Sequence, residues 1–530
     1  MKTHRVKVAS YVLAMVSLMA LLTNGSVSAD QGQYESTEAG IQFNPFELPQ
    51  NKVDASEQHV ARQHYSDEVL KFKAFIQDNN NLPFEGRTID ADKDSAAQPF
   101  PIQPPKQAIG LTSGFEGIGY THYIPPDPII AAGPNHVLLM VNSSLSIYDK
   151  NGTSLLNSTL GDWFSSLNLD TNVIFDPKCV YDPWSNRYIV LAVSFNSKTQ
   201  TSYYLIAVSQ TSDATGNWWK WKLDATLNGN TAANNTADYP QIGYDSSQSG
   251  NIYITSNQFD AQNVFQYAKL RVLKKSQLYS GSALTWNDFW NLKNGDASLV
   301  QTLQPVHTQS TTVPEWFVCT VNPVFGSGIS LFQLDPTASA PSLTLSGTVS
   351  TYTYIIPPNA KQKGGGMRID TGDCRLLNAI YQNDKIYTTT VSAYNWGNAN
   401  IESIIRYFKI DVPGKKCDID AGYGNDLMYY YYPAICVDSL SNIYLIFNRS
   451  SSNEYASVYF TGQAASDTQL QPSTLLKAGQ GNYIILDGLR NRWGDYNGIA
   501  RDFSTDRVWI YGEYAASGNQ WGTYVGNIKF

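Results

Sequence analysis

The segment "DPKCVYDPWSNRYIVLAVSFN", residues 176–196, decides the fold of this chain. It places two runs rich in Val, Ile and Tyr on either side of a turn, which is the pattern of a β-hairpin. The pattern returns as "DYPQIGYDSSQSGNIYITSNQ" (238–258), "YYPAICVDSLSNIYLIFNRS" (431–450), "DYNGIARDFSTDRVWIYGEY" (495–514) and, in shorter form, "DPIIAAGPNHVLLMVNSS" (127–144). A hairpin that recurs along one chain indicates a repeat architecture built from β-sheets.

The spacing of the copies predicts their number. The proline-like position of each copy falls at Pro128, Pro177, Pro240, Pro433 and Asn497, with steps of 49, 63, 193 and 64 residues. The long step is close to three of the others, so two degenerate copies are expected near residues 304 and 369. Each unit can hold four strands, and the sequence therefore predicts an all-β, seven-bladed β-propeller. An array of separate β-sandwiches would need spacers that these intervals lack.

The last copy predicts how the ring closes. Only 33 residues follow Asn497, too few for a whole blade. We therefore expect residues about 108–124 to supply the outermost strand of the last blade. No long apolar helix interrupts the region from 108 to 530, which we assign to the propeller.

Four motifs carry a resemblance to known proteins: "GFEGIGY" (114–120), "IPPDPIIAAGPNHVLLMVN" (124–142), "TGDCRLLNAIYQND" (371–384) and "RWGDYNGIARD" (492–502). Together they resemble a group of secreted, mostly bacterial β-propeller proteins, sialidase-like in shape and largely of unassigned function. The resemblance covers about residues 114–514 and implies the fold and export. It carries no catalytic residue over to this chain.

The first 107 residues differ from the rest. Lys2, Arg5 and Lys7 precede an apolar run and the small residues 27–29, a pattern typical of a cleaved signal peptide over residues 1–29. Residues 30–107 form a polar extension with one amphipathic helix expected at 56–78 and a proline-rich linker at 99–105. The helix cannot fold alone, so we expect it to dock on the propeller, with a spacer or a pro-segment as alternatives. The product is then secreted, to the periplasm or the cell exterior.

Composition excludes several classes of protein. The 530 residues include 34 Tyr, 12 Trp and 21 Phe but only 15% charged residues, the opposite of a disordered chain or a coiled coil. A net charge of -8 offers no basic footprint for nucleic acid, and no later run is apolar enough for membrane insertion. Five widely spaced cysteines show no zinc pattern and favour buried thiols. We expect a monomer.

The starts of the first strands and the ends of the second strands of a propeller's blades converge on one mouth of its channel. This register brings together a set of candidate ligand-binding residues: Asp127, Asp176, Asp238, Asp373, Arg375, Asn448 and Arg449. So many carboxylates should repel one another unless protons, a cation or arginines compensate. Asp at such turns commonly caps backbone amides, and that interpretation stands beside two functional ones. No cofactor is required by the sequence, and calcium is the candidate ion, with the metal ligands left unassigned.

Asp495 and Glu513 are the candidate catalytic pair. Glu513 follows the apolar strand "VWIYGEY", which could raise its pKa toward use as a general acid in glycoside hydrolysis. A mouth filled by Tyr and Arg side chains would argue against such an enzyme.

Three functions follow from these patterns. The first is ligand binding at the mouth, with a glycan or cell-surface partner favoured by tyrosine-rich stretches such as "MYYYYP" (428–433). The second is a glycoside hydrolase or lyase at the same mouth. The third is a structural or host-contact protein with an inert channel.

Overall fold

The computed structural model describes residues 29–47, 59–60, 67–78, 88–92, 107–169, 173–312, 314–335, 341–397 and 400–530. The expected signal peptide (except residue 29) and the proline-rich linker lie outside these ranges. No helix within them is long and apolar enough to cross a membrane.

Within the described ranges, five sheets hold four or five strands each, and nearly every strand pairs antiparallel with its neighbour in sequence. The first two sheets contain β7 (Ile129–Ala132), β8 (His136–Val141), β9 (Ser144–Asp149) and β10 (Ser154–Thr159), then β11 (Val173–Asp182), β12 (Arg187–Asn196), β13 (Thr201–Ser209) and β14 (Trp218–Asp224). The third contains β21 (Gln304–Pro305), β23 (Glu315–Thr320), β24 (Phe325–Leu334) and β25 (Leu343–Ile355). The other two contain β30 (Tyr429–Val437), β31 (Ile443–Ser451), β32 (Glu454–Gln463) and β33 (Thr474–Lys477), then β36 (Gly498–Asp502), β37 (Arg507–Ala516) and β38 (Gln520–Lys529).

An eleven-stranded sheet holds two more antiparallel meanders of four strands. One consists of β17 (Thr236–Tyr244), β18 (Asn251–Phe259), β19 (Phe265–Lys274) and β20 (Thr285–Trp290), the other of β26 (Asn378–Gln382), β27 (Lys385–Asn395), β28 (Ile401–Asp411) and β29 (Lys416–Gly424). The short strand β22 (His307–Thr308) joins them, because His307 pairs in parallel with Tyr244 of β17 and Ile380 of β26.

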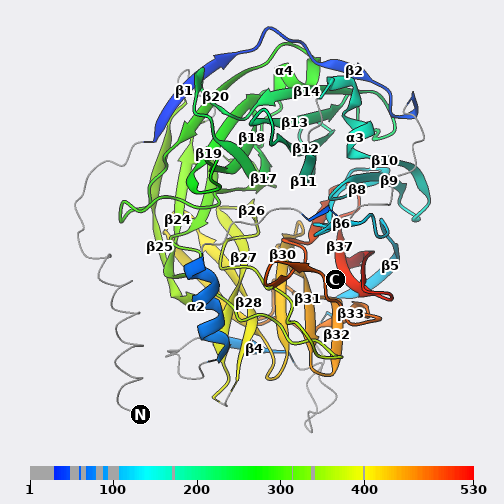
Figure 1. Cartoon of the computed structure of the whole chain (residues 1–530), viewed down its shortest axis with the longest axis vertical. Helices are drawn as coiled ribbons and strands as arrows, with labels where there is room; N and C mark the ends of the chain where they lie inside the picture. The colour runs from blue at the N-terminus through cyan, green and yellow to red at the C-terminus, as the bar shows by residue number, and fades with distance from the viewer. Residues whose placement is uncertain are drawn as a thin grey trace.

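The sheets stand around a common centre, as Figure 1 shows, and the prediction of an all-β propeller is confirmed. The predicted closure is confirmed too. Strand β5 (Gly110–Glu116) pairs antiparallel with β38 over Glu116↔Tyr524 to Gly110↔Lys529, and so forms the outer edge of the last sheet. The two ends of the propeller region therefore share one sheet.

The core lies between neighbouring sheets. Tyrosines fill much of it: Tyr188, Tyr204, Tyr253, Tyr354 and Tyr387 are among the largest fully buried side chains. Each aromatic ring buries a large apolar area at a low cost in side-chain entropy, which suits the wedge-shaped space between twisted sheets. All five cysteines are free, and four are buried.

The N-terminal part adds strands to the outer edges of the sheets. Strand β1 (Asp30–Glu35) pairs with β20, β2 (Ile41–Phe43) with β14, and β4 (Thr88–Ala91) in parallel with β29. Figure 1 shows β1 and β2 along the outer rim. These strands cover edges that would otherwise expose unpaired backbone groups.

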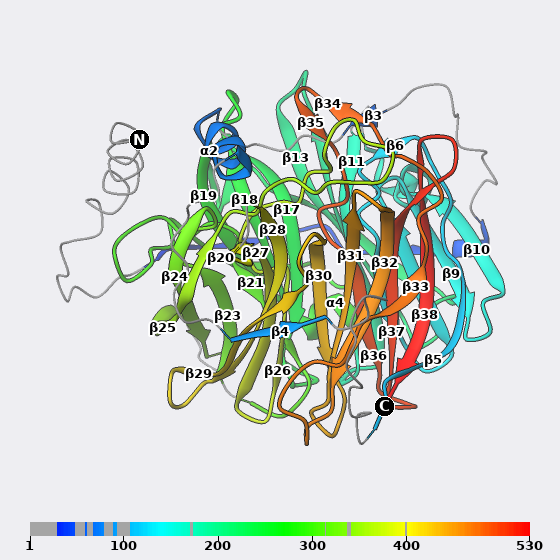
Figure 2. The same ribbon diagram turned by 90° about the horizontal axis from the view of Figure 1, so that it is seen from below.

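The expected helix at 56–78 is shorter in the structure. The helix α2 runs from Asp67 to Asp78, and Val60 instead lies in β3 (His59–Val60), which pairs with β6 (Tyr123–Ile124). The other residues before Asp67 in the expected range, 56–58 and 61–66, lie outside the described residues. The helix docks on the propeller: Ile76 is fully buried, and Val69 and Phe72 pack beside it against Ile355 and its neighbours. Figure 2 shows α2 on the same face as the hairpin of β34 (Leu486–Asp487) and β35 (Arg490–Asn491).

The remaining elements are short. They are η1 (Pro45–Glu47), α3 (Leu160–Trp163), η2 (Ser165–Leu167), β15 (Leu227–Asn228), β16 (Thr231–Ala232) and α4 (Lys275–Ser280).

Lys220 shows how the N-terminal part is held. Its ammonium on β14 lies 3.0 Å from the ring centre of Phe43 on β2 and 4.6 Å from that of Trp163, and it donates to the carbonyl of Trp163. Within the described ranges it makes no ion pair, and burial lowers the pKa of Lys220 to about 6. These two aromatic rings thus replace a carboxylate as the partner of a buried cation.

Lys220→Met should leave the protein at least as stable as the wild type at pH 7. The unfolded chain binds this proton more tightly than the folded one, so wild-type stability falls as the pH drops from about 10.5 to about 6. Lys220→Met has no such titrating group, so its stability relative to the wild type should increase as the pH falls over the same range. Urea unfolding at pH 7, 8 and 9 measures it. A stability difference between Lys220→Met and the wild type that becomes smaller toward pH 7 would contradict the lowered pKa of Lys220.

Candidate functional site at the channel mouth

The innermost strands begin with a repeated backbone distortion. Asp127, Asp176, Tyr239 and Tyr432 each precede a proline and have φ between 47° and 51°, a region that is strained for these residues. The pairing of β11, β17 and β30 with their neighbours shifts register at the same point. An extra residue in a strand bends it and re-aims side chains. The anchors found in the sequence therefore mark β-bulges that direct these residues toward the channel.

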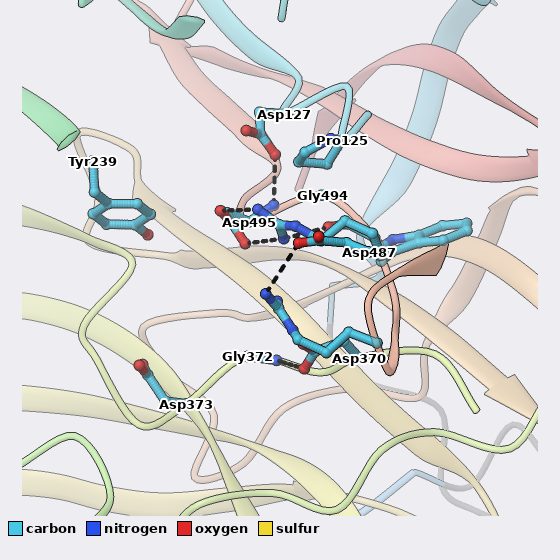
Figure 3. A network of polar contacts seen from close by, with 12 residues as sticks. Pro125, Asp127, Tyr239, Asp370, Gly372, Asp373, Asp487, Gly494 and Asp495 are labelled. Carbon is cyan, nitrogen blue, oxygen red and sulfur yellow. Dashed lines mark hydrogen bonds and ion pairs between the residues drawn. The ribbon is translucent and has the colours of Figure 1, made fainter. Parts of the chain in front are cut away.

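The bulges link neighbouring sheets by hydrogen bonds. The amide of Asn142 donates to Asp127 Oδ2 at 2.8 Å, and its oxygen accepts the Asp176 N–H at 2.7 Å. Asp176 Oδ2 in turn accepts the Tyr239 N–H at 3.1 Å, and Asp127 Oδ1 accepts the Asp495 N–H at 2.6 Å. Figure 3 shows the contact of Asp127 with Asp495. The carboxylates thus serve as caps of backbone amides, as one of the sequence interpretations expected.

We name the set Asp127, Asp176, Asp238, Asp495 and Glu513 the carboxylate cluster. Burial, followed by the nearby charges of Asp495 and Asp176, raises the pKa of Asp127 well above its usual range. Burial, then Asp238 and Asp495, raises the pKa of Asp176 in the same way. Buried carboxyls at this density keep protons that exposed carboxyls lose, which relieves the repulsion expected from the sequence.

Asp495 and Glu513 have opposite environments. Burial would raise the pKa of Asp495, but the charge of Arg492 and its hydrogen bonds at 2.8 and 3.0 Å outweigh burial and lower it. Burial raises the pKa of Glu513 well above its usual range, although Glu513 Oε2 accepts the Gly494 N–H at 2.8 Å. The pKa values of the two carboxyls are therefore shifted in opposite directions, an arrangement found in acid–base catalysis.

Tyrosine and arginine side chains close the mouth above this cluster. Arg375 makes a double contact with Asp373, at 2.8 Å to Oδ1 and 2.7 Å to Oδ2, and its guanidinium lies 4.5 Å from the ring centre of Tyr239. Tyr239 packs edge-on against Tyr496. Glu513 is fully buried, and Asp495 is 6% exposed. The mouth is thus filled in the way that argues against a sugar polymer bound across it.

Helix α2 reaches the same region from outside. Lys73 donates to Asp370 Oδ1 at 2.5 Å and to the carbonyl of Gly372 at 2.7 Å, while Arg490 donates to Asp370 Oδ2 at 2.5 Å. Figure 3 shows Asp370 and Gly372 below Asp495. The N-terminal part therefore contributes a buried cation to the rim of the mouth.

The structure separates two neighbours that were expected at the mouth. Asn448 lies there, since its amide donates to the Glu513 carbonyl at 2.6 Å and accepts from Asn497. Arg449 points to the other face of β31, where it contacts Asp92 at 3.1 Å and Glu454 at 3.0 Å. Successive side chains of a strand point to opposite faces, so both could not face the mouth. The structure therefore does not bring Arg449 to the mouth beside Asn448.

A cavity continues from the cluster down the channel. The cavity has a volume of about 720 Å³, including space open to solvent. Within it, the centre of a water molecule can occupy about 50 Å³. Its lining comes from β7, β11, β17, β22, β26, β30 and β36, among other segments. Lys178 and Tyr496 lie at the buried end, while partly exposed Arg501, Phe503 and Gln309 lie at the other. Room for a few water molecules remains inside.

Lys178 was not among the predicted site residues. It is 4% exposed, and its ammonium lies 2.9 Å from the ring centre of Tyr496. Burial lowers the pKa of Lys178 to about 7, against the charges of Asp127, Asp176 and Asp495. The sequence did contain a signal for this site residue, a lysine inside the apolar run "DPKCVYD", because lysine is rarely buried in a strand unless it has a partner or a functional role.

No group of three or more His, Cys, Asp or Glu side chains in the described ranges is placed to hold a metal ion. The carboxylates are instead satisfied by backbone N–H groups, arginines and protons, as described above. The calcium hypothesis gains no support from this geometry.

Asp238→Asn should change how stability depends on pH. Burial raises the pKa of Asp238 to about 6 from the ordinary 3.8, so the folded chain binds this proton more tightly than the unfolded chain. Its stabilising effect is complete below pH 4 and is lost as the pH rises to about 6. We expect the wild type to lose about 2 to 3 kcal/mol relative to the variant over that range. Unfolding at pH 4, 5, 6 and 7 tests this, and a difference that does not vary with pH would contradict it.

No protein-family model and no curated protein matches this chain. Among solved structures, a protein of unknown function from Dyadobacter fermentans is similar at 10% identity and a TM-score of 0.35, over 80% of this chain and 99% of that one. The Dos1 propeller matches at 10% identity and 0.35, over 74% and 75%. An α-L-arabinanase of Penicillium chrysogenum complexed with arabinobiose matches at 8% identity and 0.33, over 78% and 98%. Scores and identities this low tell us nothing about what this chain binds or does.

Proposed function

We propose that this chain is an exported β-propeller that binds a small, hydroxyl-rich ligand such as a sugar in its central channel. The observation that carries the proposal is the lining of the cavity. Amide side chains of Gln241, Gln304, Gln309, Asn378 and Asn497 alternate there with the rings of Tyr181, Tyr244, His307, Tyr496 and Phe503. Amides that donate and accept beside aromatic faces suit the hydroxyls and apolar patches of a sugar.

Two of these amides support a polar ligand. The nitrogen of Gln241 and the oxygen of Gln304 are buried and find no hydrogen-bond partner within the described ranges. Buried polar atoms are nearly always satisfied, so water or a ligand should complete them. The small free volume limits the ligand to one sugar ring or its end group, entering beside Arg501.

Ala500→Phe tests the proposal, because Ala500 lines the cavity and a phenyl ring there would fill it. We expect a monosaccharide panel, followed by calorimetry, to identify a ligand that the variant binds at least tenfold more weakly. Gln262→Ala, on the exposed turn between β18 and β19, is the matched control and should bind like the wild type. Equal binding by Ala500→Phe, or no binding of any sugar, would leave an inert channel as the better interpretation.

A glycoside hydrolase or lyase is the second candidate, favoured by the opposite environments of Asp495 and Glu513. It requires the mouth to open, since both side chains are now buried. If it is correct, a polysaccharide panel assayed with calcium and with chelator should show turnover that Asp495→Asn and Glu513→Gln each reduce at least a hundredfold. Turnover that survives in both variants, or none in the wild type, would exclude these catalytic roles.

Several broader features belong to the same proposal. Seven blades are supported by the sheet topology. Each of the five separate sheets counts as one blade, and so does each of the two meanders that β22 joins. Cleavage after residue 29, a monomeric state, and a place among the secreted bacterial propeller proteins rest on the sequence patterns alone. The same is true of a domain boundary near residue 107.

A further inference from the structure

We propose that Lys178 is a nucleophilic amine that condenses with a small aldehyde or ketone entering the central channel. The inference deepens the proposed function and rests on it, because it needs a channel that admits a small polar ligand. It concerns a residue that neither ligand binding nor glycoside hydrolysis uses.

The placement of Lys178 is unusual for a buried cation. Other buried lysines of this chain donate to fixed oxygens: Lys73 to Asp370, Lys275 to Asp182, and Lys269 to the carbonyls of Ala225 and Leu227. Within the described ranges Lys178 makes no ion pair and no hydrogen bond, and its near neighbours are the rings of Tyr496 and Tyr239. Within the described ranges its amine therefore donates no hydrogen bond, and Lys178 lines the cavity.

The surroundings favour the neutral amine, which is the nucleophilic form. Burial lowers the pKa of Lys178 to about 7, so the neutral amine with its free lone pair is accessible near neutral pH. Lys178 is only 4% exposed, so little bulk water reaches its amine. Desolvated lysines of this kind are the ones that form Schiff bases.

The neighbouring carboxyls can supply the proton that the reaction needs. The lone pair of Nζ would attack the carbonyl carbon and form a C–N bond while the C=O π bond breaks, and a proton then passes from the nitrogen to the oxygen to give a neutral carbinolamine. A protonated carboxyl of Asp127 or Asp176 would then protonate the hydroxyl, the C–O bond breaks, and water leaves with the formation of C=N. The carboxylate that remains would face the protonated imine. The overall change is an amine plus a carbonyl compound giving an imine plus water.

Trapping with a hydride donor tests the inference on the full chain. The protein is incubated at pH 7 with glycolaldehyde and sodium cyanoborohydride, which reduces an imine to a stable amine, and the labelled lysines are mapped by mass spectrometry. We expect Lys178 to be labelled at least tenfold faster than the exposed Lys363. Lys178→Met should lose that label alone.

Two controls separate accessibility from basicity. Burial also lowers the pKa of Lys269 to about 7, but Lys269 donates to two carbonyls and does not line the channel, so it should stay unlabelled. Ala500→Phe should slow the labelling of Lys178 and leave that of Lys363 unchanged. Labelling of Lys178 no faster than that of Lys363, or equal labelling of Lys178 and Lys269, would overturn the inference. Sugar binding without labelling of Lys178 would overturn the inference about Lys178 and leave the proposed sugar binding intact. Labelling of Lys178 without sugar binding would overturn the proposed sugar binding and leave the inference about Lys178 intact.

Discussion

Replacing Arg492 by methionine is expected to lower the free energy of unfolding by about 3 to 5 kcal/mol at pH 7. Arg492 is 1% exposed and holds both oxygens of Asp495 in the wild type. Its removal leaves a buried carboxylate without its main partner, next to Asp127 and Glu513. Chemical denaturation of the full chain measures the loss.

The dependence on pH gives this prediction a sign. In the wild type Arg492 lowers the pKa of Asp495, so its stabilising effect is present above pH 4 and is lost as the pH falls through the lowered value. Without Arg492, burial would raise the pKa of Asp495, and the variant would gain stability as the pH falls. The difference between the two proteins should therefore shrink from pH 7 to pH 4.

Arg492→Met combined with Asp495→Asn should recover at least half of the loss, because no charge is then left unpaired. Arg507→Met is the matched control: Arg507 is partly exposed and, within the described ranges, donates only to Thr112 and Asn527, so its loss should cost less than about 1 kcal/mol. A double variant as unstable as the single one would show that the ion pair is not the cause.

Asp92→Ala should lower the free energy of unfolding by about 3 kcal/mol or more, although Asp92 lies in the N-terminal part, more than 300 residues before its partners. Its carboxylate accepts from Tyr430 at 2.9 Å, from Arg449 at 3.1 Å, and from the backbone and hydroxyl of Ser473 at 3.0 and 2.5 Å. Asp92 itself is 2% exposed. Removing a buried acceptor of four hydrogen bonds leaves several donors unsatisfied.

Asp92→Asn should fall between the wild type and Asp92→Ala, because an amide keeps the acceptor but not the charge. Asp30→Ala is the control within the same N-terminal part. The Asp30 carboxylate accepts one exposed hydrogen bond, from Asn291, and its loss should change stability by less than about 0.5 kcal/mol. If Asp92→Ala were no more harmful than Asp30→Ala, the N-terminal part would not hold the sheets together.

The repeat explains why much of the fold could be predicted. The proline-like anchors mark the bulges at the start of the innermost strands, and an aspartate five positions later caps the following turn. Asp182 accepts the N–H of Trp184, Asp245 that of Ser247, Asp438 that of Leu440, and Asp502 that of Ser504. Both features are local in sequence, so they recur as visible spacing even where the strands between them diverge.

The N-terminal part was harder to predict for a physical reason. Its strands β1, β2 and β4 are short and pair with partners up to hundreds of residues away, so their own sequences carry little pattern. The helix was expected to begin near residue 56, but Val60 pairs with Ile124 in a strand instead. An apolar residue at helical spacing also suits a strand when a distant partner is available.

The candidate site was predicted in part. The register correctly brought Asp127, Asp176 and Asp495 together, because strand starts converge in a propeller. It could not show that Arg492, three residues before Asp495, would hold that carboxylate, nor that Arg375 would lie over the ring of Tyr239. Those contacts depend on how loops fold over the mouth, and hydrogen-bond partners across sheets have no fixed spacing in sequence.

The path of the N-terminal part also constrains the order in which the molecule can fold. The early segments pair with β20, β14, Asp370, β29, Ser473 and β38, most of which are synthesised much later. Contacts of such long sequence separation form slowly, since the intervening loop must first be closed. Strands β1 and β2 must therefore wait for the middle of the chain, β4 for β29, and β5 for the last strand, so the ring of sheets can close only after the whole chain has been made.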